Sequence, residues 1–424
     1  MIKREFYLNQ IIRYMHNGEI KVITGIRRCG KSVLLFELFR NYLLEQGISE
    51  EQIITIALDQ QKYYKFRNPI TLCEYVEGIV TADKGRQFYL FIDEVQFTKT
   101  VKDTENDDIE VTIYDMLNEL KSYKNLDVYV TGSNSKMLSC DIATEFRGRA
   151  TQIRVYPFSF GEFYTHVGGD ERKALEQYML YGGMPRILQM TDDQDKKEYL
   201  SNLFSELYVK DIVERNGIER EDILNSILDF LASQIGSLTN PSNVANAIGN
   251  MRQERVNSSL VSAYISHTIE AFLIRMAQRY DIKGKSYFNY PNKYYYTDVG
   301  LRNARLNYRQ YDPGHIMENI IYNDLIRRGY SVDVGVVVDR RHNGYLQKEV
   351  DFVVNHGDRK LYIQSAFQMG TEQKESAELD SLKLTGDFFK KIIVRMDIPH
   401  NFYDENGIFH CNLIDFLLER VELF

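Results

Sequence analysis

The sequence has no tryptophan, few cysteines and no apolar run approaching the ~18 residues that a membrane-spanning helix needs. Its four cysteines, Cys29, Cys73, Cys140 and Cys411, lie far apart and form no C-x-x-C pair. This spacing argues against a disulfide framework or a zinc knuckle, and it fits a reducing cytosol. Residues 1–5 also lack the apolar segment of a signal peptide. We therefore predict a cytoplasmic protein with no membrane partner.

Charge of one sign is not in large excess either. The 424 residues carry 52 basic and 60 acidic side chains, a net charge of −8. This mildly acidic balance argues against a surface coated for nucleic acid, although one local basic face is compatible with it. The length favours about two to four domains, because a single hydrophobic core stops growing beyond about 250–300 residues.

The most informative segment is GIRRCGKS, from Gly25 to Ser32, which fits the phosphate-binding pattern G-x-x-x-x-G-K-[ST]. A short apolar strand precedes it, and apolar residues at helical spacing follow it. The glycines let successive N–H groups face the phosphates, and the helix adds its N-terminal dipole. Lys31 can reach the β- and γ-phosphates, and Ser32 can hold Mg²⁺. The predicted nucleotide-binding residues are Gly25, Ile26, Arg27, Arg28, Cys29, Gly30, Lys31, Ser32 and Val33.

A second nucleotide motif is FYLFIDE, from Phe88 to Glu94. The apolar run is typical of a fully buried parallel strand, whose carboxyl end opens into the crevice where ligands bind. Asp93 is predicted to hold Mg²⁺, and Glu94 to orient and deprotonate the attacking water.

Two further segments contain candidates for sensing and stabilising the γ-phosphate. Ser133 and Asn134 follow an apolar strand, where a polar side chain can touch the γ-phosphate or the water; both also favour turns and helix caps. Arg147 or Arg149 can serve as an arginine finger, in cis or across an interface. A finger in trans needs neighbouring subunits, so the oligomeric state stays open.

The motifs GIRRCGKS, LFIDE, TGSNS, FRGR, YPFSFGEF and YGGMP together resemble an AAA+-type P-loop ATPase family of bacteria and archaea with a C-terminal domain of unknown function. The resemblance covers nearly the whole chain. It implies an αβα nucleotide-binding core followed by a small helical lid, with ATP and Mg²⁺ as ligands; the loop by itself does not exclude GTP. It also makes Arg186 a candidate for a lid arginine that reads the γ-phosphate.

The middle of the chain follows the winged helix-turn-helix pattern of helix, short helix, longer helix and basic hairpin. Residues 251–309 contain ten basic and four acidic side chains. Such a surplus can contact the phosphates of duplex DNA. The predicted recognition helix, which begins near Asn257, offers serines and one histidine and few base-reading side chains. Winged helices also dock proteins, so a protein partner is the alternative.

The last third follows the order of a restriction-endonuclease-like fold, in which a helix Glu, a strand Asp and an E-x-K motif surround Mg²⁺. Glu318 and Asp351 stand at the first two positions, but the third reads Gln364-Ser365-Ala366. We therefore predict little or no nuclease activity, unless Lys348 or Lys360 replaces the missing lysine.

The sequence thus predicts an α/β protein in four parts: a P-loop αβα core (1–156), a helical lid (157–216), a winged helix-turn-helix (217–312) and a degenerate nuclease-like α/β domain (313–424). The predicted function is Mg²⁺-dependent ATP binding and hydrolysis that controls a C-terminal DNA-binding module. An ATP-dependent switch that docks a protein partner is the alternative, and an ATP-gated nuclease is disfavoured.

Overall fold

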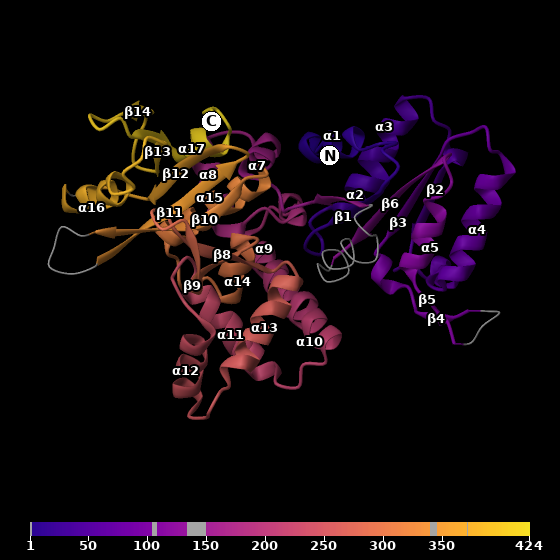
Figure 1. The fold of residues 1–424 in the computed structure, drawn as a ribbon, viewed down its shortest axis with the longest axis horizontal. Helices are drawn as coiled ribbons and strands as arrows, with labels where there is room; N and C mark the ends of the chain where they lie inside the picture. The colour runs from indigo at the N-terminus through magenta and orange to yellow at the C-terminus, as the bar shows by residue number, and fades with distance from the viewer. Residues whose placement is uncertain (1, 104–107, 134–149, 340–345, 371) are drawn as a thin grey trace. The chain divides into compact units, whose positions relative to one another are not determined.

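The computed structural model describes residues 2–103, 108–133, 150–339, 346–370 and 372–424. The chain divides into two compact units (Figure 1). The first unit comprises Met1–Tyr156 with Glu270–Phe272, and the second comprises Pro157–Ile269 with Leu273–Phe424. Among the described residues, no helix has the length and apolar character needed to cross a bilayer.

The first unit is built on a five-stranded sheet in which every neighbouring pair is parallel. Its strand order is β2 (Ile53–Ala57), β3 (Phe88–Asp93), β6 (Leu126–Gly132), β1 (Ile20–Thr24) and β7 (Ala150–Arg154). All residues of β1, β3 and β6 are buried. Strands buried along their whole length result because helices cover both faces of a parallel sheet. The P-loop strand β1 is separated from β3 by β6.

Helices cover the two faces of this sheet. Apolar side chains of α4 (Pro69–Ala82) and α5 (Ile113–Leu120) pack into one core with the strands. On the other face, Phe39 packs against Phe91 and Tyr129, with ring centroids 5.5 and 4.9 Å apart. The remaining elements of this unit are α1 (Glu5–Arg13), α2 (Lys31–Val33), a π-helical segment (Leu34–Phe39), α3 (Arg40–Glu45), three 3₁₀ segments (Glu50–Gln52, Gln61–Arg67 and Val95–Phe97) and a small hairpin of β4 (Val101–Lys102) and β5 (Glu110–Val111).

The second unit begins with helices. They are α7 (Phe160–Val167), α8 (Glu171–Tyr181), a 3₁₀ segment (Pro185–Gln189), α9 (Asp193–Asn202), a π-helical segment (Leu203–Val209), α10 (Lys210–Asn216), α11 (Glu221–Ser233), α12 (Pro241–Arg252), α13 (Ser258–Glu270) and α14 (Val299–Arg305). The predicted helix-turn-helix falls on α11 to α13. The middle helix of the three, α12, runs through Gly249 to Arg252.

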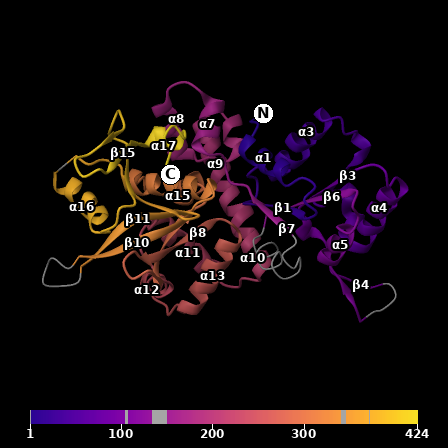
Figure 2. The same cartoon turned by 45° about the horizontal axis from the view of Figure 1, so that its top comes forward.

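An eight-stranded mixed sheet forms the rest of the second unit. Its order is β14 (Phe402–Tyr403), β15 (Phe409–Asn412), β13 (Lys390–Arg395), β12 (Arg359–Ala366), β11 (Leu346–His356), β10 (Ser331–Asp339), β8 (Ile274–Asp281) and β9 (Ser286–Tyr296). Helix α15 (Pro313–Arg327) lies against this sheet (Figures 1 and 2), and α16 (Glu372–Lys383) and α17 (Leu413–Leu417) complete the unit.

The boundary predicted at residue 312 differs from the structure. The hairpin predicted as a wing, β8 and β9, is the edge of the C-terminal sheet, because Arg279–Asp281 pair in parallel with Val334–Val336 of β10. Ile282, directly after β8, also lies in the core of that sheet with Val337. The sequence predicted the hairpin but not its partner, since the local pattern of a hairpin does not say which third strand it joins.

Candidate functional site

The phosphate loop takes a backbone path that requires glycine at its first position. Gly25 has φ = 151°, and a Cβ there would lie 2.1 Å from the carbonyl oxygen of Val155. Gly30 has φ = 98° and directly precedes Lys31, the first residue of α2. Backbone in this left-handed region is strained for any residue with a side chain. The two glycines therefore let the loop curl between β1 and the helix.

Lys31 is folded onto its own loop. Its side chain is 3% exposed, and Nζ donates to the carbonyl oxygens of Gly25 at 3.0 Å and Ile26 at 3.2 Å. Two neutral acceptors compensate a buried ammonium only partly. A phosphate oxygen is a stronger partner for this group, so the loop presents a buried positive charge suited to polyphosphate.

Asp93, at the carboxyl end of β3, receives hydrogen bonds from two hydroxyl groups. Thr131 Oγ1 donates to Asp93 Oδ1, and the hydroxyl of Ser32 is a second side-chain partner of the same carboxylate. Burial raises the pKa of Asp93, and the hydrogen bonds from Thr131 and Ser32 act against that rise. A carboxylate and a hydroxyl at one place are hard oxygen ligands of the kind that Mg²⁺ prefers. The residues therefore fit a magnesium ion between β3 and the phosphate loop.

Glu94 follows Asp93 with a left-handed backbone of φ = 55°. Its backbone N donates to Thr131 Oγ1 at 3.0 Å, and its Oε2 accepts from Ser133 Oγ at 3.2 Å and from Gln96 Nε2. Neutral donors thus orient the carboxylate beside the Asp93 position. A carboxylate held in this way can accept a proton from a water molecule.

Ser133 joins the phosphate loop to Glu94. Its hydroxyl is 2% exposed, accepts from Arg27 Nε at 3.3 Å and donates to Glu94. Of the two predicted sensor residues, Ser133 therefore lies in this cluster, whereas Asn134 lies outside the described residues. The candidate fingers Arg147 and Arg149 also lie outside the described residues.

The candidate lid arginine belongs to the second unit. Arg186 is exposed, and its guanidinium lies 5.4 Å from the ring centroid of Tyr199. Its role as a reader of the γ-phosphate stays a prediction.

Three residues of the nucleotide site were missed from the sequence. Thr131 is the first residue of the TGSNS motif and Gln96 lies two residues after Glu94, and their polarity at a strand end was the available signal. The third, Arg4, could not be recognised from the local sequence, because its hydrogen-bond partners are far from it along the chain. Its guanidinium, 4% exposed, donates to the carbonyl oxygens of Cys29 and Tyr156, each at 2.8 Å.

In the second unit, the two acidic residues predicted from the nuclease-like pattern are near one another. Glu318 and Asp351 both face Lys293 Nζ, at 2.8 and 3.6 Å. Lys293 was not predicted for this site. Lys348 pairs instead with Asp380 at 3.0 Å, and the ammonium of Lys360 lies over two aromatic rings.

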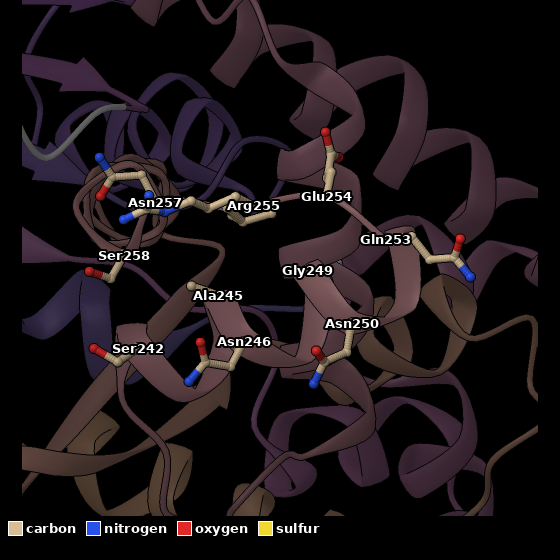
Figure 3. Close-up of a pocket in the computed structure, with 11 residues that line it drawn as sticks. Ser242, Ala245, Asn246, Gly249, Asn250, Gln253, Glu254, Arg255, Asn257 and Ser258 are labelled. Atoms are coloured by element: carbon tan, nitrogen blue, oxygen red, sulfur yellow. The ribbon is translucent and has the colours of Figure 1, made fainter.

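The region predicted as a helix-turn-helix contains a cavity of about 920 Å³ between α12 and the start of α13 (Figure 3). Exposed side chains line this cavity. Two of them, Asn246 and Asn250, belong to α12, and Gln253 is the residue directly after this helix. Asn257 and Arg255 also line the cavity. Amide side chains can pair with adenine in the major groove. The amides therefore gather on α12, while the predicted recognition helix α13 contributes mainly Ser258.

Several of the basic side chains counted over residues 251–309 are buried or paired within the second unit. Arg302 is fully buried and donates to the carbonyl oxygens of Ala232 and Gln310, each at 2.8 Å. Lys293 is buried among carboxylates, and Arg305 pairs with Asp229. The basic charge available to a phosphate backbone is therefore smaller than the count over residues 251–309 indicates.

The parallel sheet and the phosphate loop give the first unit the arrangement of a P-loop α/β domain. In agreement, the family model of an AAA domain matches residues 17–164. A second family model, a domain of unknown function (DUF8612), matches residues 172–312.

The chain belongs to the same protein family as an uncharacterized protein of Haemophilus influenzae, with 34% identity over 427 residues and 99% of each chain covered. An uncharacterized protein of Methanocaldococcus jannaschii is 26% identical over 84% of this chain and 77% of its own length.

Solved structures with detectable likeness include AMPPCP-bound DnaA from Aquifex aeolicus, at 16% identity over 63% of this chain and 86% of that chain, with a TM-score of 0.32. The Aeropyrum pernix ORC1 protein in complex with DNA is similar at 10% identity over 72% of this chain and 93% of that chain, with a TM-score of 0.31. TM-scores of this size do not establish a shared overall fold.

Proposed function

We propose that the first unit binds Mg²⁺ and ATP and hydrolyses the nucleotide. The observation that carries this proposal is the convergence of Lys31, Ser32, Asp93 and Glu94 at the carboxyl ends of parallel strands. Thr131 holds two of them, because it donates to Asp93 and accepts from the backbone N of Glu94. Ligands bind at this edge of open α/β sheets.

Each of these four side chains has its own role in the proposed hydrolysis. The ammonium of Lys31 would bind the β- and γ-phosphates, and Ser32 and Asp93 would hold Mg²⁺, which when bound neutralises phosphate charge. Glu94 would take a proton from water as the water oxygen bonds to the γ-phosphorus and the bond to the leaving ADP oxygen breaks. The predicted contributions of Asn134 and of Arg147 or Arg149 would complete the stabilisation of charge.

The proposal is tested with the full chain and three proteins. The wild type should release phosphate from ATP, Lys31→Ala should lose nucleotide binding, and Glu94→Gln should bind ATP but turn over at least about 100-fold more slowly. Equal turnover by wild type and Glu94→Gln would exclude the proposed base. A parallel titration with GTP determines the base preference.

We further propose that the nucleotide state controls a DNA-binding module formed by α12 and α13. The amide-lined cavity supports this proposal, because Asn246, Asn250 and Gln253 make no side-chain hydrogen bond among the described residues and are available to base edges. Arg255 at the same cavity can contact a phosphate.

A protein partner is the second candidate output. The observation that favours it is the internal use of basic charge. Glu254, which lines this cavity, pairs with Arg252 and Arg220, and both arginines also pair with Asp222. The surroundings of the cavity are thus close to neutral, and neutral polar grooves suit a peptide as well as a nucleic acid.

One paired experiment separates the two outputs. ATP hydrolysis and binding of duplex DNA are measured in the same samples for wild type and Glu94→Gln, at low and moderate salt. Stimulated turnover, with tighter DNA binding by ATP-loaded Glu94→Gln, identifies DNA as the output. Absence of DNA binding even at low salt rejects it and leaves the protein partner, whose ATP-dependent co-purification should disappear in Lys31→Ala.

A further inference from the structure

The second unit contains a buried charge cluster that the proposed ATPase chemistry does not use. Lys293 of β9 lies among three carboxylates from α15 and β11. Its Nζ is 2.8 Å from Glu318 Oε1, 2.6 Å from Glu349 Oε1 and 3.6 Å from Asp351 Oδ1. Lys293, Glu318 and Asp351 are 3%, 7% and 6% exposed. We call these four residues the Lys293 cluster.

Neighbouring groups occupy further positions around the carboxylates. Tyr295 OH donates to Glu318 Oε1 at 2.6 Å, and Ser365 N donates to Asp351 Oδ2 at 2.8 Å. Gly236 closes the other side of Glu318, since a Cβ at this glycine would lie 3.2 and 3.3 Å from the two carboxylate oxygens. The carboxylates are therefore held by protein donors and packed against backbone.

The third position of the nuclease-like pattern does not supply a metal ligand. Gln364 Oε1, the oxygen that a metal would need, accepts from the backbone N of Asp351 at 3.2 Å. Its Nε2 donates to Glu378 Oε2 at 2.7 Å. Ala366, at the position of the lysine, has no polar side chain. The residues present do not fit the Mg²⁺ site of a nuclease of this fold.

We propose that Lys293 is the built-in cation of this site: its ammonium stands where the carboxylates would share a divalent metal, and it ties β9, α15 and β11 together in a centre without metal-dependent nuclease chemistry. An ammonium offers three N–H donors, and three carboxylates surround this one. The ammonium of Lys293 therefore supplies the positive charge that the three carboxylates would otherwise draw from a metal ion in solution.

The electrostatic balance of the cluster agrees with this assignment. Burial lowers the pKa of Lys293, but the carboxylates of Glu318, Asp351 and Glu349 outweigh it and leave the pKa above its ordinary value. The ammonium is therefore charged at neutral pH. Burial, followed by repulsion from Glu318, raises the pKa of Asp351. The ammonium of Lys293 offsets part of the acidic charge, and Glu349 is the most exposed of the three acidic side chains.

The test uses the full, nucleotide-free chain carrying Ser32→Ala, which removes one of the two proposed metal ligands of the ATPase site. Mn²⁺ binding is titrated by electron paramagnetic resonance, and Tm is measured with Mn²⁺ and with a chelator. With Lys293 intact, we expect no Mn²⁺ bound at the cluster and no metal-dependent shift in Tm. Lys293→Ala should have a lower Tm in chelator, should bind Mn²⁺ at least tenfold more tightly, and should regain part of its Tm when the metal is added.

Two controls make the result specific. Adding Asp351→Asn to Lys293→Ala should remove the gained Mn²⁺ binding. Lys348→Ala removes another lysine that pairs with carboxylates, Asp380 and Asp339, and it should gain no Mn²⁺ binding.

Two results would overturn the proposal. One is Mn²⁺ binding with Lys293 intact that raises Tm and is lost on Asp351→Asn. The other is a folded Lys293→Ala protein that gains no Mn²⁺ binding. If Lys293→Ala does not fold, Lys293→Met replaces it at similar volume, and the titration with Lys293 intact still decides between a site that takes a metal and one that does not.

Discussion

The guanidinium of Arg4 donates to the carbonyl oxygen of Cys29 at 2.8 Å, which anchors the phosphate loop to the segment that begins α1. The same group donates to the carbonyl oxygen of Tyr156, and it lies 4.5 Å from the centroid of the Tyr7 ring. A residue 25 positions before Cys29 therefore fixes the backbone that is predicted to bind phosphate.

We expect Arg4→Ala to weaken nucleotide binding more than catalysis. The substitution leaves a buried carbonyl in the loop without this donor, and removal of one partner of a buried hydrogen bond costs about 1–3 kcal/mol. The KM for ATP should rise about tenfold while kcat changes less. Steady-state kinetics measure both values. Arg13→Ala, on the same helix but with an exposed side chain pairing with Tyr14, should leave KM unchanged; an equal effect of both substitutions would contradict the role of Arg4.

Gly25→Ala tests the close approach between the phosphate loop and the segment after β7. A Cβ would lie 2.1 Å from the carbonyl oxygen of Val155 and 3.1 Å from Cys29 Sγ, so backbone must move. We expect loss of ATP binding by calorimetry and a lower Tm. Gly78→Ala is the matched control, because a Cβ on that residue of α4 meets nothing within 4 Å. It should keep ATP binding and raise the free energy of unfolding by about 0.5–1 kcal/mol. Normal binding by Gly25→Ala would show that the loop has another path available.

Local pattern predicted the first unit well because its information lies within short segments. The strand 20–24, the strand that ends in Asp93 and the helix after the loop have boundaries set by apolar runs and glycines. Because both strands are parallel, their carboxyl ends lie at one edge of the sheet, and Lys31, Ser32 and Asp93 follow or end these strands. Arg4 could not be found in this way, since its partner is chosen by the tertiary fold.

The second unit was predicted less completely for the same physical reason. A strand at a sheet edge and a wing have the same sequence pattern, so β8 and β9 were separated from the sheet they join. Lys293 was counted as a surface charge, although a neighbouring helix and strand bury it. The YGGMP motif shows a related limit. Its Gly182 and Gly183 are required by close packing, because Cβ atoms there would lie 2.1 Å from Asp298 Oδ1 and from the carbonyl oxygen of Phe158.

Ser133→Ala should separate sensing of the nucleotide from binding. The hydroxyl accepts from Arg27 of the phosphate loop and donates to Glu94. Without this hydroxyl, Glu94 keeps the hydrogen bond from Gln96 Nε2 to its carboxylate and the hydrogen bond from its backbone N to Thr131 Oγ1. We expect about a tenfold decrease in kcat, equivalent to about 1.4 kcal/mol, with ATP affinity within about twofold of wild type. Single-turnover hydrolysis and equilibrium titration provide the two values. Ser122→Ala, at an exposed turn, is the control, and a parallel loss in affinity and kcat for Ser133→Ala would assign the hydroxyl to binding.

Asp298 gives the second unit a predictable pH dependence. Its carboxylate is 3% exposed and accepts hydrogen bonds from Gly183 N at 2.7 Å and Leu301 N at 3.1 Å. Burial raises its pKa to about 6, although these hydrogen bonds act against the rise. Between the unfolded pKa of about 3.9 and this value, the folded chain binds more protons than the unfolded chain. The stabilising contribution of the protonated carboxyl is therefore complete below the unfolded pKa and is lost as pH rises through about 6. Denaturant unfolding at a series of pH values should show a contribution of about 3 kcal/mol that disappears over this window. Asp298→Asn cannot ionise, so the difference in unfolding free energy between wild type and Asp298→Asn should shift in favour of the variant as pH rises from 4 to 7. A pH-independent difference would place the folded pKa of Asp298 near its ordinary value.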